Sequence, residues 1–480
     1  MRGFLASSIG VTCAAALALP LTPPAVAATA RPVPATDAAT TARPALHAGT
    51  RVTAPSARRA AEPNAAGSTQ SLPLQPLTRA TPSGPATEQG LPRRAVRHFS
   101  LVGVVWDDPD AELHGRVQVR TRAAGTGAWS DWQDVETHNA EHAADRDAAE
   151  RASDRVRGAT APLWVGDSDG VELRVSSASD GAEAGARELP AAPPLPSGLR
   201  LELVDPGEDD TRSGTEEEPR AVDAVNAESS ALAEASAANA GLAPFGATEI
   251  AELSRAETEE EYLALHSEGL TEQQRQAKPY IGPRPGIVTR RGWGADEGLR
   301  ESGFRYTKKV KAAFVHHTAS GNNYSCSQVP SLIRSIYRYH VKSMGWRDIG
   351  YNFLIDKCGK IYEGRAGGVA RPVLGAHTLG FNSNSMGIAV LGSYGAKKPS
   401  KAAVKAIARL SAWKLGLHGM NPKKKTTLKS AGSNLYSKGK KVRLNVISGH
   451  RDGFKTECPG GKLYAKLGSA RSKAAQYQGR

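Results

Sequence analysis

One short loop near the end of the chain limits what this sequence can fold into. Residues 449–459 place His450 and Cys458 eight positions apart (458 − 450) on a segment interrupted by two glycines and a proline. Glycine and proline at this density disfavour a continuous helix, so the segment is expected to fold back as a loop that brings imidazole and thiol together. Both side chains are good zinc ligands, but two ligands do not make a site.

The N-terminus predicts export. Arg2 is followed by an apolar run over residues 9–21 and by small residues at 25–27, which is the pattern of a signal peptide spanning residues 1–27. The run is too short for a comfortable membrane span, and no other stretch is long and apolar enough. The mature protein is therefore expected to be secreted and extracellular, able to associate with a cell wall, and without a transmembrane segment.

Cysteine usage supports a role for Cys458. Removal of the signal peptide leaves three of the four cysteines, Cys326, Cys358 and Cys458. Disulfides persist in exported proteins, and an odd number leaves one cysteine over. Cys326 and Cys358 flank one compact segment and are the expected pair. Cys458 is then left for metal ligation, with a merely buried thiol or a different pairing as the alternatives.

Composition divides the chain before its C-terminal part. Residues 28–95 are rich in Ala, Thr, Pro and Arg, and residues 206–280 are acidic and Ala-rich. Both are expected to be disordered linkers, because they cannot bury enough apolar surface to offset chain entropy. Short alternating strands over 96–205 predict a small β-sandwich-like domain. The polar, Ala-rich residues 139–157 are expected to form an exposed insertion in it.

The net charge of +14 is compatible with several anionic partners. A basic surface can attract nucleic acid, an anionic membrane or an anionic polymer such as a cell wall. The sequence contains no nucleic-acid-binding motif, so nucleic acid is not expected as a partner. The chain is expected to act as a monomer. Tryptophans of the β-rich domain can stack on sugar rings, although burial in a core is the more common role of such residues.

The C-terminal part, residues 281–480, alternates strand and helix patterns. It is expected to form an α/β domain in which helices flank a mixed β-sheet. A helix is expected to begin after Ser400, which is a suitable N-cap residue. The main expected elements are strands at 310–318, 351–356, 387–391 and 442–447 and helices at 331–343 and 400–417.

A third metal ligand is expected from the strand that ends in His316 and His317. Adjacent residues on a strand point to opposite faces, so only one of the two can serve a given site. The pair alone is a weak signal, but the order of the motifs after it is more specific. These motifs are Gly350-Tyr351-Asn352-Phe353, Gly375-Ala376-His377-Thr378, Gly449-His450-Arg451-Asp452 and Thr456-Glu457-Cys458-Pro459-Gly460.

In this order the motifs resemble the peptidoglycan recognition protein family, which shares its fold with type-2 N-acetylmuramoyl-L-alanine amidases. The resemblance covers roughly residues 290–467 and leaves out the linkers and the β-rich region. It implies a secreted, zinc-dependent amidase that hydrolyses the bond between the lactyl group of N-acetylmuramic acid and the L-alanine of peptidoglycan. The alternative from another class is a protein that binds peptidoglycan without turnover.

The resemblance also implies the metal ligands. They are His316, His450 and Cys458, and His317 then points away from the metal. Three protein ligands leave a fourth position for water, as in catalytic rather than structural zinc sites. A purely structural zinc needs a fourth protein ligand, for which the sequence offers no obvious candidate.

Catalytic and substrate-binding residues are implied by the same resemblance. Tyr351 is expected to hydrogen-bond the zinc water or the developing oxyanion. Thr456 stands where some relatives carry lysine, so it can donate a hydrogen bond but supplies no positive charge. The glycopeptide groove is expected to be lined by His340, Arg365, His377 and Asn382. His340 equally suits a packed core position, and the type of stem peptide is left open.

Overall fold

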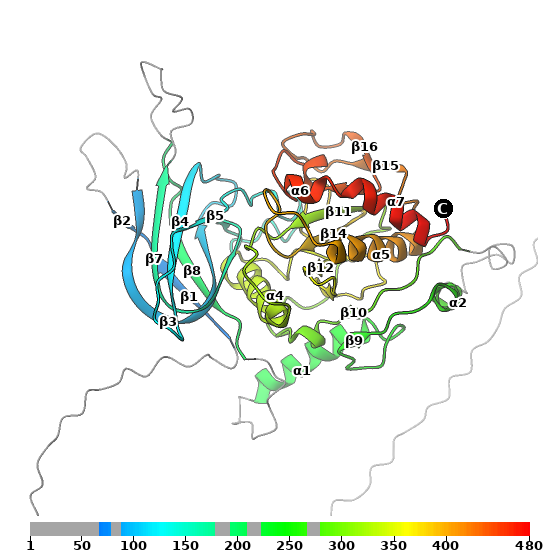
Figure 1. Ribbon diagram of the computed structural model, residues 1–480, viewed down its shortest axis with the longest axis horizontal. Coiled ribbons are helices and arrows are strands. Elements are labelled where there is room, and N and C mark those ends of the chain that lie inside the picture. Colours follow the sequence, from blue (N-terminus) through cyan, green and yellow to red (C-terminus); the bar gives the residue numbers. More distant parts are fainter. Residues whose placement is uncertain (1–66, 78–87, 178–192, 209–221, 266–278) are drawn as a thin grey trace, which may run out of the picture. The chain divides into compact units, whose positions relative to one another are not determined.

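The computed structural model describes residues 67–77, 88–177, 193–208, 222–265 and 279–480 (Figure 1). The predicted signal peptide and most of the first predicted linker lie outside these residues. All described residues fall within one unit of the chain, Arg59–Arg480. In this part of the chain, every helix is too short or too polar to cross a lipid bilayer.

An antiparallel sheet of eight strands forms the β-rich domain, which confirms that prediction. The longest strand, β3, pairs with β7 over most of its length and with β8 near its end, and its register with β7 shifts at several points. Such irregularities let a sheet bend around its own apolar core. The strands are β1 (Ser68–Pro73), β2 (Gln75–Pro76), β3 (Glu88–Trp106), β4 (Gly115–Ala123), β5 (Gln133–Val135), β6 (Gly158–Ala159), β7 (Leu163–Ser177) and β8 (Arg200–Asp205).

Both segments expected to be linkers contain more structure than their composition predicts. Strands β1 and β2 and the start of β3 fall within residues 28–95. Helix α1 (Val222–Ala237), strand β9 (Glu249–Ile250) and helix α2 (Arg255–Leu265) fall within residues 206–280. The reason is tertiary pairing, which overrides weak local preference: β1 pairs along the whole of β8, and β9 pairs with a strand of the C-terminal sheet.

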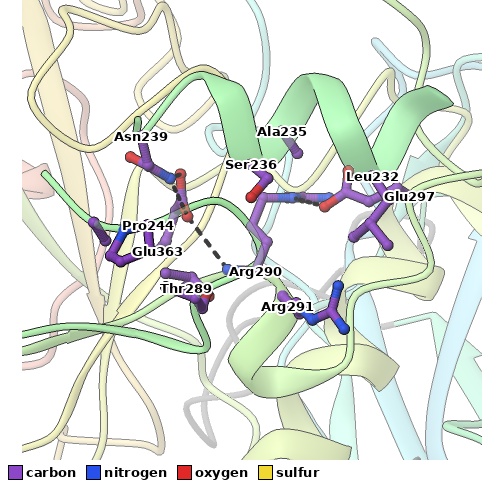
Figure 2. Close-up of a pocket in the computed structure, with 12 residues that line it drawn as sticks. Leu232, Ala235, Ser236, Asn239, Pro244, Thr289, Arg290, Arg291, Glu297 and Glu363 are labelled. Atoms are coloured by element: carbon purple, nitrogen blue, oxygen red, sulfur yellow. Dashed lines mark hydrogen bonds and ion pairs between the residues drawn. The ribbon is translucent and has the colours of Figure 1, made fainter. Parts of the chain in front are cut away.

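Helix α1 also packs on the C-terminal domain. Figure 2 shows Leu232 and Ser236 of this helix beside the guanidinium of Arg290. Just after the helix, the Asn239 amide donates to both carboxylate oxygens of Glu363 at 3.0 Å. Contacts of this kind explain why an acidic, Ala-rich stretch is ordered.

The C-terminal domain contains the predicted mixed sheet, with seven strands in the order β17-β11-β14-β12-β13-β10-β9. Neighbours from β17 to β12 run parallel, whereas β12 and β13 form an antiparallel hairpin. Besides β9, the strands are β10 (Ile287–Val288), β11 (Ala312–His317), β12 (Phe353–Ile355), β13 (Ile361–Glu363), β14 (Ser385–Val390) and β17 (Ile447–Gly449). A separate hairpin joins β15 (Lys425–Lys429) and β16 (Lys441–Asn445).

Helices cover both faces of this sheet, as predicted. On one face, Phe353 and Ile355 pack with residues of α5 (Lys401–Leu417) and α7 (Leu467–Tyr477). On the other face, Leu354 packs with residues of α4 (Val329–Arg338). The Ser400 hydroxyl caps α5 by accepting a hydrogen bond from Ala403 N at 3.0 Å. The remaining elements are α6 (Gly461–Tyr464), the π-helical turn η5 (Tyr339–Ser343) and the 3-10 turns η3 (Arg291–Trp293), η4 (Cys326–Gln328) and η6 (His450–Asp452).

The β-rich domain and the C-terminal domain share an apolar cluster. Leu101 and Trp164 of the β-rich domain belong to the same buried cluster as Ile333 and Tyr339 of the C-terminal domain. The Tyr339 hydroxyl donates to the Thr160 carbonyl across this contact at 3.1 Å. The two domains are therefore packed together, and not merely tethered.

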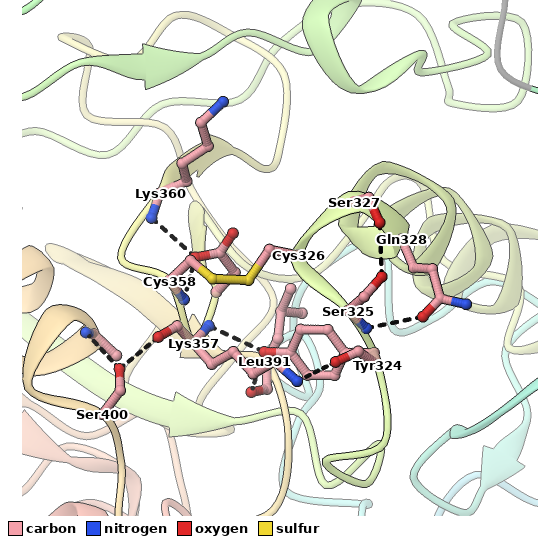
Figure 3. Close-up of a disulfide and its surroundings, with 12 residues drawn as sticks. Tyr324, Ser325, Cys326, Ser327, Gln328, Lys357, Cys358, Lys360, Leu391 and Ser400 are labelled. Atoms are coloured by element: carbon pink, nitrogen blue, oxygen red, sulfur yellow. Dashed lines mark hydrogen bonds between the residues drawn. A yellow bond between two sulfur atoms is a disulfide. The ribbon is translucent and has the colours of Figure 1, made fainter.

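The predicted disulfide between Cys326 and Cys358 is confirmed (Figure 3). Cys326 begins η4 just before helix α4, and Cys358 lies in the turn between β12 and β13. Next to it, Lys357 N donates to the Tyr324 hydroxyl at 3.1 Å, and the Lys357 carbonyl accepts from Ser400 Oγ at 2.6 Å. The bond thus ties the start of α4 to the edge of the sheet.

We expect this disulfide to contribute about 3–4 kcal/mol to the free energy of unfolding, because it closes a loop between residues 32 positions apart. The double variant Cys326→Ser/Cys358→Ser should lose that amount in denaturant unfolding. Treatment with a phosphine reductant should bring the native chain to the same midpoint and leave the variant unchanged. An identical midpoint for native chain and variant would contradict the expectation.

Candidate metal centre

The register of two parallel strands brings His316 and His450 together. Strand β11 pairs with β17 so that Val315 lies opposite Gly449. The next residue along the chain is a histidine in both cases, His316 on β11 and His450 at the start of η6, so both imidazoles leave the same edge of the sheet. Their ring centroids are 4.5 Å apart, and both side chains are fully buried. His317 faces the other way, where its Nδ1 accepts a hydrogen bond from Tyr394 N at 3.3 Å.

The loop after β17 folds back as the glycine and proline pattern predicted. Its first turn, η6, is closed by the Gly453 amide, which donates to the His450 carbonyl at 2.9 Å. Its two ends meet where Arg451 N donates to the Cys458 carbonyl at 3.1 Å. This closure sets Cys458 Sγ 3.8 Å from His316 Nδ1. Two histidines and one cysteine from separate parts of the sequence therefore share one buried point.

A fourth donor, His142, completes the cluster and was not anticipated. It comes from residues 139–157 of the β-rich domain, and its Nε2 lies 3.2 Å from His450 Nδ1. The donor atoms of His142, His316, His450 and Cys458 all lie within 4.8 Å of one another. Two expectations are thereby corrected. The insertion is not simply exposed, because it packs into the site, and a candidate for a fourth protein ligand exists.

Burial sets the protonation of the four donors. It lowers the pKa of His316 and of His450 well below the usual value, and it lowers the pKa of His142 to about 3. All three imidazoles are therefore neutral, which is the form that ligates a metal. Burial raises the pKa of the Cys458 thiol, so without a cation the thiol keeps its proton. A bound metal would displace that proton and be held by the thiolate.

The donor set fits a zinc ion. With zinc–nitrogen bonds of about 2.0–2.1 Å, two nitrogens of a tetrahedral site lie about 3.3 Å apart, and a sulfur lies slightly farther. The spacings of 3.2 Å between His142 and His450 and 3.8 Å between His316 and Cys458 match that shape. Among the described residues, the Nδ1 atom of His142, which faces away from His450, has no hydrogen-bond partner. His316 Nε2 lies 3.3 Å from Thr378 Oγ1, which can orient this ring.

The two residues expected to be catalytic lie beside the cluster. The Tyr351 ring centroid is 5.6 Å from that of His316 and 6.0 Å from that of His142. Burial raises the pKa of the Tyr351 phenol well above its usual value, so the hydroxyl stays protonated and can donate. The Thr456 hydroxyl donates to Glu141 Oε1 at 2.5 Å and accepts from Cys458 N at 3.1 Å.

Two of the four residues expected to contact substrate bind residues 139–157 instead. The Arg365 guanidinium donates to both Glu150 carboxylate oxygens at 2.9 and 2.8 Å. The Asn382 amide donates to Asp145 Oδ1 at 2.9 Å. Both side chains therefore already hold carboxylates.

The other two residues, His340 and His377, are packed inside the domain. His340 lies on η5, stacks near Trp346 at a centroid distance of 4.6 Å, and accepts from Gly350 N at 3.2 Å through its Nδ1. His377 Nδ1 lies 2.9 Å from Thr378 Oγ1, the same hydroxyl that contacts His316. His340 is thus a core histidine in this structure, and His377 is linked to a member of the cluster through Thr378.

Comparison with known proteins agrees with this geometry. The family model described as N-acetylmuramoyl-L-alanine amidase matches residues 306–461. Peptidoglycan-recognition protein SC2 of Drosophila simulans is 31% identical over 183 residues, which are 38% of this chain and 84% of that protein. The chain belongs to the peptidoglycan-recognition protein and N-acetylmuramoyl-L-alanine amidase family.

The aligned part is a small share of some relatives and almost the whole of others. A human N-acetylmuramoyl-L-alanine amidase is 32% identical over 162 residues, which are 32% of this chain and 23% of that protein. The solved structure of Drosophila PGRP-LB is 27% identical, covers 38% of this chain and 92% of its own chain, and has a TM-score of 0.30. The family model described as Rv3811 N-terminal galactose-binding domain-like matches residues 54–195. His142 lies within that second match and outside the amidase match.

The packed position of His340 gives a test that separates structure from metal binding. His340→Leu keeps an apolar side chain but leaves the buried Gly350 N–H without its acceptor, which costs about 1–3 kcal/mol of unfolding free energy. We expect that loss in denaturant unfolding while the zinc content of the folded protein stays unchanged. A loss of zinc without a loss of stability would contradict the assignment of His340 to the core.

Proposed function

We propose that the chain is a zinc-dependent N-acetylmuramoyl-L-alanine amidase that hydrolyses the lactyl–L-alanine amide of peptidoglycan. The observation that carries the proposal is the convergence of His316, His450 and Cys458 at one buried point. These three residues lie within the part of the chain that matches the amidase family model. Zinc held there supplies Lewis acidity and activates water for attack on an amide carbonyl.

The surrounding residues have separable roles in this proposal. The protonated phenol of Tyr351 donates to the oxygen on which negative charge develops, which is most effective in a site that excludes water. The Thr456 hydroxyl is a second donor near the same place, but it carries no charge and cannot replace an acid. Thr378 orients the His316 imidazole through the 3.3 Å contact between their side chains.

Arg365 and Asn382 are proposed to bind the stem peptide of the substrate. Their support is that each already donates to a carboxylate, Glu150 in one case and Asp145 in the other. A guanidinium pairs with a carboxylate through two parallel hydrogen bonds, so Arg365 fits an acidic group of a peptide. Peptidoglycan is the corresponding partner class.

We place the activity outside the cytoplasm. The signal-peptide pattern at residues 1–27 supports this, and so does the disulfide between Cys326 and Cys358, because disulfides persist in oxidising compartments.

One observation favours a second candidate. With His142, the cluster offers four protein donors, which is the composition of a structural zinc site. In this second candidate function, a zinc ion bound by all four side chains would link the β-rich domain to the C-terminal domain. The protein would then bind peptidoglycan without cleaving it. Removal of His142 distinguishes the two candidates, because only the amidase gains an open coordination position that it can use.

The test of the amidase uses the full chain carrying His142→Ala/Asp145→Asn/Glu150→Gln, because that variant keeps the three proposed ligands, frees the fourth position and takes the carboxylates away from Asn382 and Arg365. We expect about one zinc ion per chain and release of new L-alanine N-termini from purified peptidoglycan. Adding Cys458→Ala should abolish both zinc binding and release. His317→Ala is the matched control, since its imidazole faces away from the cluster, and it should retain both.

If L-alanine N-termini are still released in the presence of a chelator, or with Cys458→Ala, the metal mechanism is wrong. Tight binding to peptidoglycan with zinc present and no release would favour the binding protein.

A further inference from the structure

Residues 139–157, which we call the plug segment, occupy the groove expected to hold substrate. Three of its acidic side chains each contact a residue expected to serve catalysis or substrate binding. Glu141 accepts from Thr456 at 2.5 Å, Asp145 from Asn382 at 2.9 Å, and Glu150 from Arg365 at 2.8 Å. The segment thus places carboxylates along the groove, and His142 lies between the first two of them in the sequence.

The plug segment leaves almost no free space at the cluster. The cavity that adjoins the cluster, whose lining includes His142, Thr456 and Cys458, has a volume of about 20 Å³. A space of that size holds a single water molecule, whereas pockets for organic ligands measure about 300–1,000 Å³. A larger cavity of about 420 Å³ lies beside Glu141 and Thr456, but none of the four donors lines it. A glycopeptide in the larger cavity would therefore still be separated from the donors in the described conformation.

We propose that His142 is a fourth protein ligand of the metal and that the plug segment holds the chain in a latent form. In that form an imidazole occupies the position that the hydrolytic water needs, and acidic side chains occupy the donors that the substrate needs. Activity then requires displacement of the plug segment. The inference rests on the proposed function, because a site without turnover has nothing to keep latent.

Backbone contacts fix the plug segment closely against the C-terminal domain. Leu379 N donates to the Glu141 carbonyl at 2.9 Å, and Arg157 N donates to the Met344 carbonyl at 3.1 Å. A side chain could not be added at Gly345, because its Cβ would lie 2.0 Å from the Arg155 carbonyl oxygen. The ends of the segment are therefore held by specific contacts.

The middle of the plug segment is accessible, and most of the apolar contact between the domains lies outside the segment. Arg146 and Asp147 are exposed, with side-chain exposures of 62% each. Ala143 and Val156 belong to the apolar cluster that the two domains share, but the other buried residues of that cluster lie outside the segment. The domains would therefore keep most of this contact if the segment left the groove.

The first experiment measures metal coordination directly and does not depend on turnover. The full chain is loaded with Co²⁺ and titrated with azide, which binds a free coordination position and changes the visible spectrum. We expect no response from the native chain and a saturable response from His142→Ala. The matched control is His138→Ala, an exposed histidine that pairs with Glu136 at 3.1 Å and lies outside the cluster. It should behave as the native chain does.

Two outcomes of this experiment overturn the proposal. An azide response in the native chain equal to that of His142→Ala shows that His142 is not a ligand. Loss of cobalt from a folded His142→Ala chain shows that the fourth donor is needed to hold the metal, as in a structural site. Neither outcome depends on whether the chain is an amidase.

The second experiment loosens the plug segment without changing any metal donor. Asp145→Asn/Glu150→Gln removes the carboxylates that Asn382 and Arg365 bind. Without Glu150, the charge of the buried guanidinium is no longer balanced, so the closed arrangement becomes less stable relative to one in which Arg365 contacts water or substrate. A minor open state is commonly populated at about 0.1–10%, so opening should raise the rate of L-alanine release about 10- to 1,000-fold. Asp147→Asn is the matched control, because Asp147 pairs only with the exposed Lys438 among the described residues.

The rates separate failure of the latency proposal from failure of the proposed function. Equal, substantial release by the native chain, by His142→Ala and by the loosened variant contradicts latency and leaves the amidase intact. No release by any of them, although azide reaches the metal in His142→Ala, contradicts the amidase.

Discussion

Four side chains of the kinds that bind metal ions are buried at one point, and the rest of the site depends on this constraint. Three neutral imidazoles and a protonated thiol lie beside a cavity of only about 20 Å³. The four donor atoms lie within 4.8 Å of one another, with 3.2 Å between His142 Nε2 and His450 Nδ1. A zinc ion fits donors of these types at this spacing, and it would displace the proton of the thiol.

The fold supplies this cluster with donors in two different ways. The parallel register of β11 and β17 places His316 and His450, and the closed loop after β17 places Cys458. The backbone hydrogen bonds that set these three positions lie within the C-terminal domain. His142 comes from the β-rich domain, and its position depends on how that domain packs. A ligand supplied in this way can be removed while the other three stay in place, which suits a regulated site better than a permanently structural one.

The contacts of the plug segment select one arrangement of the segment on the C-terminal domain, even where they add little to the free energy of unfolding. The Glu150–Arg365 pair is buried, with side-chain exposures of 8% and 5%. A buried ion pair adds little net stability, because desolvation offsets most of the Coulomb attraction. Breaking it by removing one partner is nevertheless costly, so the pair selects one arrangement over others. In the proposed function, an acidic substrate group would offer Arg365 the same interaction, so the segment and the substrate would compete for one donor.

Much of the C-terminal domain was predictable because its signals are local. Alternating and helical apolar patterns indicated the mixed sheet and helix α5, and Ser400 caps that helix as its side-chain chemistry suggested. Counting cysteines indicated the pair Cys326 and Cys358. The same reasoning failed where structure depends on distant partners. Strand β1 lies in a Pro-rich stretch and is ordered only because β8 pairs with it.

His142 shows this limit most clearly. It is a single histidine in a polar, Ala-rich segment, a setting in which a solvated side chain is the ordinary expectation. Its contact with His450 joins residues 308 positions apart, and no spacing or periodicity signals such a pair. The three-ligand prediction therefore described an open site, whereas the structure places a fourth possible donor beside the three.

The most direct test of four-ligand coordination is a crystal structure of the zinc-loaded full chain with an anomalous difference map at the zinc edge. We predict one zinc peak about 2.0–2.3 Å from four donors, which are His142 Nε2, His316 Nδ1, His450 Nδ1 and Cys458 Sγ. A peak bound by only three of them and a water molecule, with His142 turned away, would contradict the latent site. So would a chain that binds no zinc there.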